Sequence, residues 1–345
     1  MKKRKGFIAL TRKGMLYFAV FWALVGLIVY GPPENLDFGI GQAGKPVEGS
    51  LTIHFIDVGQ ADAAVILCGG EVMMIDGGNA ADSSLIYSYL KNTLGLGYID
   101  YMIATHPHED HIGGLSGALN ACTVGTVYSP VTEYEGKTFE SLKKYTEKQG
   151  KTLTVPTQGQ KISLGDAEVQ FLSLNKRYED INDQSIVVRI EFGETSFLFT
   201  GDAEWEAEHD LIESGYDLRA TLLKVGHHGS SSSSAYVFLR EVMPEYAVIS
   251  VGAGNSYGHP TEAALSRLQD AGAQILRTDQ NGHIVVSSDG KTLSFAVQKG
   301  SVPDNKRDGM AAQLTFEGVL EEIAWQLMHW SKNLWEKCLF WIGAA

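Results

Sequence analysis

The chain has 345 residues, of which 44% are hydrophobic and 20% are charged. These fractions are typical of a globular protein and exclude a disordered or fibrous chain. The formal net charge is −13, which gives no support to a broad basic surface for nucleic acid. A local positive patch or a bound metal could still attract phosphate.

The first 31 residues are predicted to be a membrane anchor. Six basic residues, Lys2, Lys3, Arg4, Lys5, Arg12 and Lys13, precede an uncharged apolar run at 14–31. A helix of that length spans about 27 Å, close to the hydrocarbon thickness of a bilayer. We therefore expect a single-pass protein of the cell membrane, with a cytoplasmic N-terminus and an extracellular remainder. The alternative is a cleaved signal peptide, although no small-x-small site directly follows the run.

Residues 32–50, rich in Gly and Pro, are predicted to be a linker. Without the six N-terminal basic residues, the chain has 22 basic residues against 41 acidic ones, a net charge of −19. The three cysteines, Cys68, Cys122 and Cys338, lack CxxC spacing. They predict neither a disulfide framework nor a cysteine metal site, and they leave a Cys68–Cys122 bridge open.

Residues 51–298 alternate strand-like and helix-like segments. Strands are expected at 51–58, 63–68, 71–76, 99–105 and 124–128, then near 162 and at 169–172, 185–190, 196–200, 221–225, 246–251 and 284–287. Helices are expected at 82–94, 138–149, 203–213, 235–242 and 262–271. This order fits one α/β (α+β) domain in which mixed sheets carry helices on their outer faces.

Residues 299–345 are predicted to form a linker and an amphipathic, Trp-rich helix. Apolar residues between Phe316 and Trp341 recur at three- and four-residue steps. Such a helix could pack on the domain or on a second copy of the chain, as in a homo-oligomer. Its tryptophans suit a membrane interface, whereas Glu317, Glu321 and Glu322 would face anionic lipid. Both interpretations stay open.

The segment IATHPHEDHIGGL, residues 103–115, has the highest density of potential metal ligands. His106 and His108, two apart in an extended loop, can project to the same side and hold one metal ion. Asp110 and His111 can hold a second, because imidazole and carboxylate both suit zinc and similar ions. The following Gly-Gly pair permits close backbone packing behind the loop. The alternative, a polar loop with Asp110 as a helix cap, does not explain so many donors.

Two later segments would complete a two-metal site. FLFTGDAE ends an apolar strand at Asp202, which we expect to be a bridging carboxylate. LLKVGHHGS ends another strand just before His227. Because each donor follows a strand, all of them can converge on one edge of the sheet.

With these donors, the sequence resembles the metallo-β-lactamase fold superfamily in its HxHxDH loop, its later GD and its strand-end histidine. The segments IDVGQADAAVI, INDQSIVV, FLFTGDAE, LLKVGHHGS and NSYGHP resemble more narrowly the extracellular hydrolase domain of ComEC-type competence DNA-uptake proteins. The resemblance covers residues 51–298 and implies a four-layer αββα sandwich with two divalent ions at one edge. The ligands it implies are His106, His108, Asp110, His111, Asp202 and His227.

The sequence departs from the wider superfamily at one ligand. No histidine occurs between His111 and His209, so the usual third histidine of the first metal is missing. Asp183 or Asn182, in the segment NDQS, could supply an oxygen ligand in its place. An oxygen-rich site tolerates manganese better than an imidazole-rich one, so zinc is the expected metal and manganese the alternative.

Other polar residues are assigned around this expected centre. Two divalent ions would activate water and offset charge on a phosphoryl oxygen, so no nucleophilic side chain is required. Asp110 is expected to orient the nucleophile, and His228 and His259, with Ser230, to bind phosphate or supply a general acid. The alternative is structural: His228 would support the metal ligands from behind, and His259 would be a loop histidine held by Pro260.

Some polar residues near these motifs have weaker assignments. Gln60 and Asp62 either line the same edge or serve only as turn residues. The serine run 230–234 is predicted to cap the following helix and to offer hydroxyl and N–H groups to an anion. The histidines outside any motif, His54, His209, His283 and His329, are interpreted as structural.

The sequence therefore predicts a membrane-anchored, extracytoplasmic, two-metal phosphodiesterase, with DNA the substrate that the resemblance suggests most. The alternatives are a phosphoesterase of wall polymer or phosphocholine substituents, a β-lactam hydrolase, and a non-catalytic binding module. The acidic charge mildly favours a smaller substrate. The missing histidine argues against a β-lactamase, and the six donors argue against a binding module.

Overall fold

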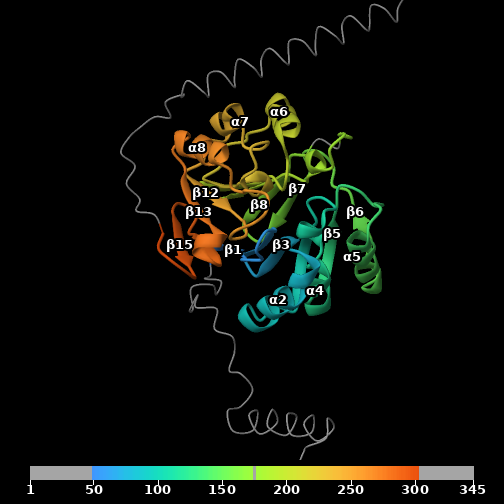
Figure 1. Ribbon diagram of the computed structural model, residues 1–345. Helices are drawn as coiled ribbons and strands as arrows, with labels where there is room; N and C mark the ends of the chain where they lie inside the picture. The colour runs from blue at the N-terminus through green and yellow to red at the C-terminus, as the bar shows by residue number, and fades with distance from the viewer. Residues whose placement is uncertain (1–48, 174–175, 303–345) are drawn as a thin grey trace, which may run out of the picture. The chain divides into compact units, whose positions relative to one another are not determined.

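The computed structural model describes residues 49–173 and 176–302. Two β-sheets pack face to face and helices cover both outer faces (Figure 1). One outer layer contains α2 (Ser83–Ser88), α4 (Leu115–Ala121) and α5 (Lys137–Lys148), and the other contains α6 (Trp205–Glu213), α7 (Tyr236–Val242) and α8 (Glu262–Asp270). The predicted αββα sandwich is therefore confirmed.

The first sheet has eight strands in the order β15-β14-β1-β2-β3-β4-β5-β6. Its strands are β1 (Leu51–Phe55), β2 (Ala63–Cys68), β3 (Glu71–Gly77), β4 (Tyr98–Ile103), β5 (Thr123–Tyr128), β6 (Leu153–Thr154), β14 (Ile284–Ser288) and β15 (Leu293–Val297). Strands β3 to β6 run parallel. Their carboxyl ends therefore meet at one edge of the sheet.

The second sheet has seven strands in the order β13-β12-β11-β10-β9-β8-β7. Its strands are β7 (Lys161–Leu164), β8 (Ala167–Phe171), β9 (Val188–Phe192), β10 (Thr195–Phe199), β11 (Leu222–Lys224), β12 (Tyr246–Ile249) and β13 (Gln274–Arg277). Strands β10 to β13 run parallel to one another. Short helices lie in the connections: η1 (Ala80–Asp82), η2 (Tyr89–Thr93), α3 (Glu109–Ile112), η3 (Asn182–Gln184), η4 (Gly226–Gly229) and α9 (Thr278–Asn281).

The main core lies between the two sheets. Alternate residues of β1 and β10 face inward, and the Phe55 and Phe199 rings stack with centroids 5.9 Å apart. The intervening Leu198 of β10 belongs to a second core beneath α6, α7 and α8. Because successive side chains of a strand point to opposite faces, a strand in the middle of the sandwich is apolar on both. This explains the continuous apolar runs of the sequence.

Several predictions differ from the structure or lie outside it. The strand expected at 185–190 begins at Val188, and residues 185–187, which follow η3, belong to no helix or strand. Strands β6, β13 and β15 were not predicted. Cys68 and Cys122 are both free, so they form no bridge.

The predicted membrane anchor, most of the linker after it, and the C-terminal helix with His329 fall outside the described residues. No helix of the described segments has the length and apolar character to cross a bilayer.

The serine loop, residues 230–234, is held by two buried charged side chains. Arg267 of α8 donates from Nε to the Ser234 carbonyl and from Nη2 to the carbonyls of Ser231 and Ser233, each at 2.9 Å. Glu208 of α6 accepts hydrogen bonds from the backbone N–H groups of Ser234 and Ala235. The N-cap residue of α7 is Ala235, and within the described residues no side chain accepts a capping hydrogen bond from the helix. The prediction that the serines cap this helix was therefore wrong, because the cap position is an alanine and the serine run ends one residue before it.

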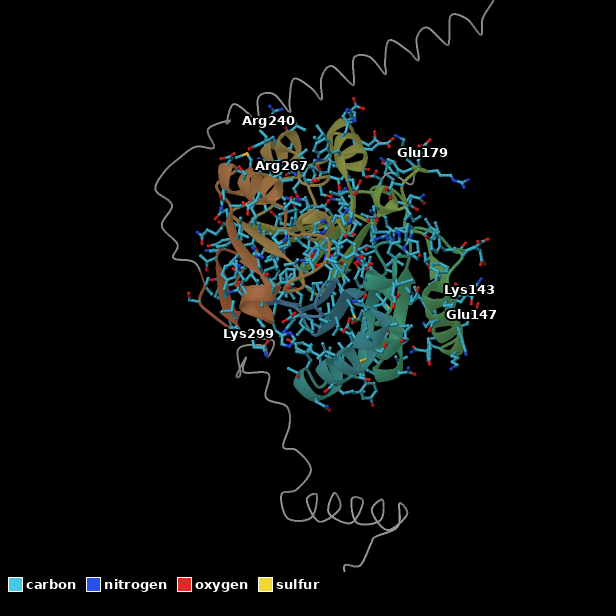
Figure 2. All side chains as sticks on the ribbon, viewed as in Figure 1. Lys143, Glu147, Glu179, Arg240, Arg267 and Lys299 are labelled. Carbon is cyan, nitrogen blue, oxygen red and sulfur yellow. The ribbon has the colours of Figure 1, made fainter. Side chains whose placement is uncertain are left out.

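Replacing Arg267 by alanine is expected to lower the free energy of unfolding by about 3–5 kcal/mol, because three carbonyls of the loop lose a donor. Arg240 of α7, labelled with Arg267 in Figure 2, is the matched control, since 51% of its side chain is exposed. Arg240→Ala should change stability by about 0.5 kcal/mol or less. Urea unfolding measures both, and equal effects would contradict this account of the loop.

His283 makes folding stability sensitive to acid. Its ring is 4% exposed, and its Nδ1 accepts a hydrogen bond of 2.9 Å from the Asp57 N–H. Burial lowers the pKa of His283 to about 4. The unfolded chain therefore binds the proton more readily between pH 6.5 and 4, and stability falls as the pH drops through that window.

The loss of stability from His283 should reach about 3 kcal/mol near pH 4. A His283→Gln variant cannot take up this proton, so its unfolding free energy should fall less between pH 7 and pH 4.5. Urea titrations of both proteins at these two pH values test the prediction. Equal losses in the two proteins would exclude His283 as a cause.

Candidate metal centre

The predicted donors come together at the edge where parallel strands of both sheets end. His106 follows β4, Asp202 follows β10, and the His227-His228 pair follows β11. The loop after β4 turns directly into α3, which carries Asp110 and His111. Gly113 and Gly114 pack against the backbone after β3, where a Cβ on Gly114 would lie 1.9 Å from the Gly77 oxygen. The close packing predicted behind this loop is therefore confirmed.

The Asp202 carboxylate lies at the centre of the cluster. Its Oδ2 is 3.2 Å from His111 Nε2, 3.7 Å from His227 Nε2, 3.8 Å from His228 Nε2 and 3.9 Å from His106 Nε2. Asp202 is 2% exposed. Burial alone would raise the pKa of Asp202, but the surrounding imidazoles outweigh burial and hold that pKa well below its usual range. A single buried anion thus faces four imidazole nitrogens.

Four donors form a group compact enough for one divalent ion. Ligand atoms of Asp110, His111, Asp202 and His228 all lie within 4.8 Å of one another. His228 Nε2 is 3.2 Å from Asp110 Oδ2. Within the described segments, His111 Nε2 and Asp202 Oδ1 are buried without a hydrogen bond, which is costly unless another partner satisfies them. Imidazole and carboxylate donors with unsatisfied buried atoms fit a zinc-like ion.

His106 and His108 form a second pair of facing donors. His106 Nε2 is 3.0 Å from His108 Nδ1, and the ring centroids are 4.7 Å apart. Burial and the neighbouring His111 lower the pKa of His106 well below its ordinary value. A neutral imidazole is the form that binds a metal. The pair therefore suits a second ion beside Asp202.

The two oxygen donors predicted for this second ion lie in different environments. Asp183 Oδ1 accepts hydrogen bonds from the N–H groups of Glu204, at 2.8 Å, and Ala207, at 3.2 Å. Asp183 thus stabilises the start of α6, and burial raises its pKa to about 6. Asn182 Oδ1 is buried and has no hydrogen bond in the described part of the chain. Of the two, Asn182 has the uncommitted oxygen.

A carboxylate that sequence reasoning missed holds the far side of His111. Asp76 Oδ2 lies 2.8 Å from His111 Nδ1 and accepts the Thr105 hydroxyl at 2.7 Å. Asp76 Oδ1 accepts the Thr105 N–H at 2.8 Å. Such a partner fixes the tautomer and the orientation of a metal-binding histidine. The sequence signal was present, because Asp76 ends the apolar segment EVMMID just before two glycines.

His228 is held in a similar way from behind. Its Nδ1 lies 3.0 Å from the Ser250 carbonyl and 3.3 Å from Asp62 Oδ1, and Asp62 Oδ2 accepts from Lys224 Nζ at 2.6 Å. Asp62, left open from the sequence, therefore belongs to this edge. Lys224 was missed, although a lysine inside the apolar segment LLKVG is unusual. Burial would lower the pKa of His228, but Asp202 and Asp62 raise it to about 10. A bound cation would take the place of that proton.

His227 and His228 point to different places because both have a left-handed backbone, with φ values of 46° and 53°. Non-glycine residues adopt this conformation at an energetic cost and often at functional sites. His228 is 2% exposed, whereas 24% of the His227 side chain is exposed. His227 Nδ1 lies 2.8 Å from Glu204 Oε1, which also accepts the Ser232 hydroxyl at 2.7 Å. His227 thus lies at the accessible rim of the cluster.

The segment NSYGHP brings further rings to the same rim. The His259 ring lies 5.5 Å from that of His227, and the Tyr257 ring stacks on His259 at 5.7 Å. Asn255 holds this loop by accepting from the N–H groups of Tyr257 and His259, each at 3.1 Å. Gln60 Oε1 accepts from the Gly252 N–H at 3.1 Å, so Gln60 also belongs here. The Ser230 hydroxyl contacts that of Ser232 at 2.8 Å.

The structural interpretation of two other histidines agrees with their positions. His54 Nδ1 lies 3.0 Å from the Tyr89 hydroxyl within the first sheet and its covering helices. His209 lies on α6 beside Asp210 and Glu213. Neither is in contact with the Asp202 cluster.

Comparison with known proteins agrees with this architecture. The family described as the metallo-beta-lactamase superfamily matches residues 56–253. Competence protein ComA of Neisseria gonorrhoeae is 30% identical over 291 residues, which are 81% of this chain and 36% of that protein. ComE operon protein 3 of Bacillus subtilis is 29% identical over 265 residues, which are 71% of this chain and 34% of that protein. This chain thus spans about a third of the length of these curated relatives.

Among solved structures, the metallo-beta-lactamase fold protein YhfI of Bacillus subtilis has 16% sequence identity and a TM-score of 0.43, and the match covers 66% of this chain and 95% of YhfI. The family match extends over more than half of the chain and includes the HxHxDH loop, Asp202 and His228. The chain belongs to the metallo-beta-lactamase superfamily.

Proposed function

We propose that this protein is a two-metal hydrolase of phosphodiesters and that DNA is its substrate. The observation that carries the proposal is the buried Asp202 carboxylate, whose Oδ2 has four imidazole nitrogens within 3.9 Å. Such a cluster of carboxylate and imidazole donors is favourable for divalent cations. The similarity to competence proteins supports DNA, and the match covers about a third of each of those relatives.

The contacts support a division of the donors between two ions that share Asp202. Asp110, His111 and His228 would hold one ion. His106 and His108 would hold the other, and Asn182 is a better third ligand than Asp183 because its oxygen is free of hydrogen bonds. In this assignment His228 takes the ligand role that the sequence suggested for His227. Zinc is the proposed metal and manganese the alternative.

Two divalent ions bound here would activate water as a nucleophile and offset the negative charge of a phosphoryl oxygen. The side chains of this protein would orient the reactants. The exposed Asp110 carboxylate accepts a hydrogen bond from the attacking water, and 33% of its side chain is accessible. His227, held by Glu204, presents Nε2 to the leaving oxygen and supplies its proton. His259 binds the adjacent phosphate oxygen from the rim.

A substrate panel with metal analysis tests the proposal. The panel contains single- and double-stranded DNA, bis(p-nitrophenyl) phosphate, a phosphocholine ester and a chromogenic β-lactam. We expect two bound ions per chain and hydrolysis of DNA and of the activated phosphodiester. Cleavage of the phosphocholine ester or the β-lactam alone would favour those substrates instead. Fewer than one bound ion per chain, together with no hydrolysis after zinc or manganese is added, would exclude the hydrolase and favour a non-catalytic binding module.

We also propose that the apolar segment 14–31 anchors the protein in the cell membrane with the hydrolase domain outside. The Trp-rich segment near the C-terminus would contact the membrane interface or a second copy of the chain. Protease treatment of intact cells should degrade the hydrolase domain, and alkaline washing should leave the protein in the membrane fraction. Recovery of the protein in the soluble fraction would contradict the anchor.

A further inference from the structure

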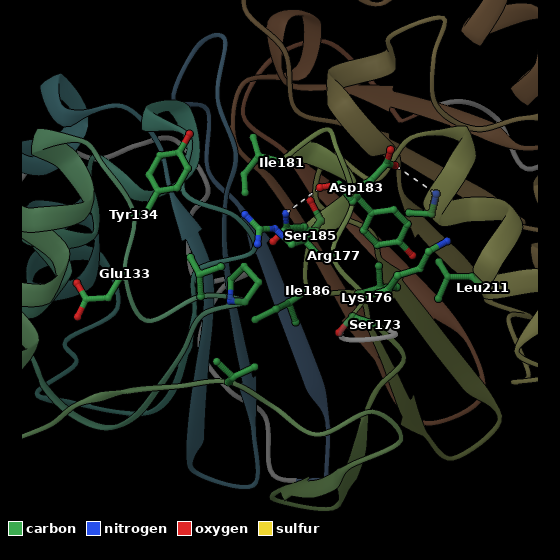
Figure 3. Close-up of a pocket in the computed structure, with 17 residues that line it drawn as sticks. Glu133, Tyr134, Ser173, Lys176, Arg177, Ile181, Asp183, Ser185, Ile186 and Leu211 are labelled. Atoms are coloured by element: carbon green, nitrogen blue, oxygen red, sulfur yellow. Dashed lines mark hydrogen bonds between the residues drawn. The ribbon is translucent and has the colours of Figure 1, made fainter. Parts of the chain in front are cut away.

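A cavity of about 500 Å³ lies beside the metal centre at the same edge of the sandwich. Its walls come from the loop that follows β5, from the described residues of the connection between β8 and β9 (Ser173 and residues within 176–187), and from Ala207 and Leu211 of α6 (Figure 3). Ser185 belongs both to the lining and to the metal centre, because its hydroxyl lies 3.4 Å from His106 Nδ1 and accepts the Asp202 N–H at 3.0 Å. A group bound in the cavity would therefore be adjacent to the reacting bond. The size is that of a typical small-molecule site.

Most of the charged side chains that line the cavity are paired with other described groups, and one cationic side chain remains available to bind a ligand. Lys176 pairs with Asp210 at 2.6 Å, and Glu133 pairs with Lys143 outside the cavity. The Asp183 carboxylate is occupied by the N–H groups of α6. Arg177 lines the cavity and makes no ion pair with a carboxylate of the described segments. Its guanidinium can bind a phosphate through two hydrogen bonds.

The other lining residues are mostly apolar or aromatic, with Ser173 and Gln184 as uncharged polar ones. They include Pro130, Val131, Val155, Ile186 and Leu211, with Tyr134 at the mouth, 37% exposed. Figure 3 shows Tyr134 and Leu211 on opposite sides, with Arg177 and Ser185 between them. Such walls suit the flat face of a heterocycle, whereas the hydroxyls of a polyol phosphate would lose their hydrogen bonds to water. A quaternary ammonium group would be repelled by Arg177.

We propose that this cavity binds the nucleoside unit next to the scissile phosphodiester, with the base against the apolar walls and Arg177 on the phosphate of that unit. The inference rests on the proposed function and deepens it, because it selects nucleotides over wall polymers and phosphocholine. It also assigns a substrate-binding role to a residue outside the metal ligands.

Binding of three small phosphates to the full chain tests the inference. Deoxythymidine 5′-monophosphate, glycerol 3-phosphate and phosphocholine are titrated calorimetrically into the metal-loaded chain; all three are phosphomonoesters, so the proposed phosphodiesterase does not consume them. We expect the nucleotide to bind at least about ten-fold more tightly than the other two, and Arg177→Ala to weaken it about ten-fold. Arg219→Ala is the matched control, because Arg219 is 71% exposed, precedes β11 and pairs with Asp217. It should leave binding unchanged.

A second variant tests the apolar wall. Val131 is half-buried in a loop, so Val131→Trp can fill the cavity without disturbing the core, and it should abolish nucleotide binding while the unfolding transition is kept. Equal binding of all three phosphates, or an unchanged affinity in both Arg177→Ala and Val131→Trp, would overturn the inference. If the wild type hydrolyses phosphodiesters but the two variants bind the nucleotide as tightly as the wild type, only the proposed role of the cavity is refuted. Arg177-dependent binding without hydrolysis would refute the proposed function alone.

Discussion

Replacing Asp202 by alanine is expected to abolish hydrolysis of an activated phosphodiester, with a loss of at least about 10³-fold in kcat/KM. The physical reason is that both proposed ions share Asp202 as a ligand. One oxygen of its carboxylate faces the Nε2 atoms of His106, His111, His227 and His228. Without this anion, both proposed ions lose a ligand, and the negative charge that offsets their positive charges is removed. Metal content should fall from two ions per chain to one or fewer. Atomic emission spectrometry measures the metal content, and steady-state kinetics on the same preparation measures kcat/KM.

Two further variants make the Asp202 result specific. Asp202→Asn keeps the size of the side chain and removes its charge, so it should lose metal and activity nearly as severely as alanine. Asp217→Ala removes a partly exposed carboxylate that pairs with Arg219 before β11, and it should leave both unchanged. Two retained ions and full activity in Asp202→Ala would remove this residue from the centre and exclude the arrangement proposed here.

The fold was predictable from the sequence where local patterns agree with tertiary structure. Continuous apolar segments such as AAVILC and TSFLF are buried strands, because central strands of a sandwich are covered on both faces. The edge strands β13 and β15 were missed for the opposite reason. Most residues of their sequences, QILR and LSFAV, are only partly buried. Their pairing with β12 and β14 depends on contacts that no local pattern contains.

The candidate site was predictable as far as the strand ends. His106, Asp202 and the His227-His228 pair each follow a strand, and the parallel strands bring them to one edge. The sequence could not show which of two adjacent histidines turns inward, because that depends on the left-handed backbone at both positions. Nor could it show that Asp183 is occupied by α6, since that contact joins residues more than 20 positions apart. Asp76 is separated from His111 by 35 positions and was missed for the same reason.

Alanine substitution of His228 and of His227 should have different consequences, although the two residues are adjacent. His228 is buried, and its Nε2 lies 3.2 Å from Asp110 Oδ2. His228→Ala should therefore lose about one ion per chain and reduce kcat/KM by at least about 10³-fold for every phosphodiester. His227 is partly exposed and hydrogen-bonded to Glu204. His227→Ala should retain both ions.

The dependence on the leaving group separates the two roles further. If His227 supplies the proton to the leaving oxygen, His227→Ala should lower the rate on DNA by about 10²–10⁴-fold, because its alkoxide leaving group requires that proton. Bis(p-nitrophenyl) phosphate releases a stable phenolate, so the same variant should cleave it at a nearly unchanged rate. His228→Ala should be defective on both substrates, because it lacks an ion. Loss of metal in His227→Ala with retention in His228→Ala would reverse the assignment, and His227 would then be the ligand that the sequence alone suggested.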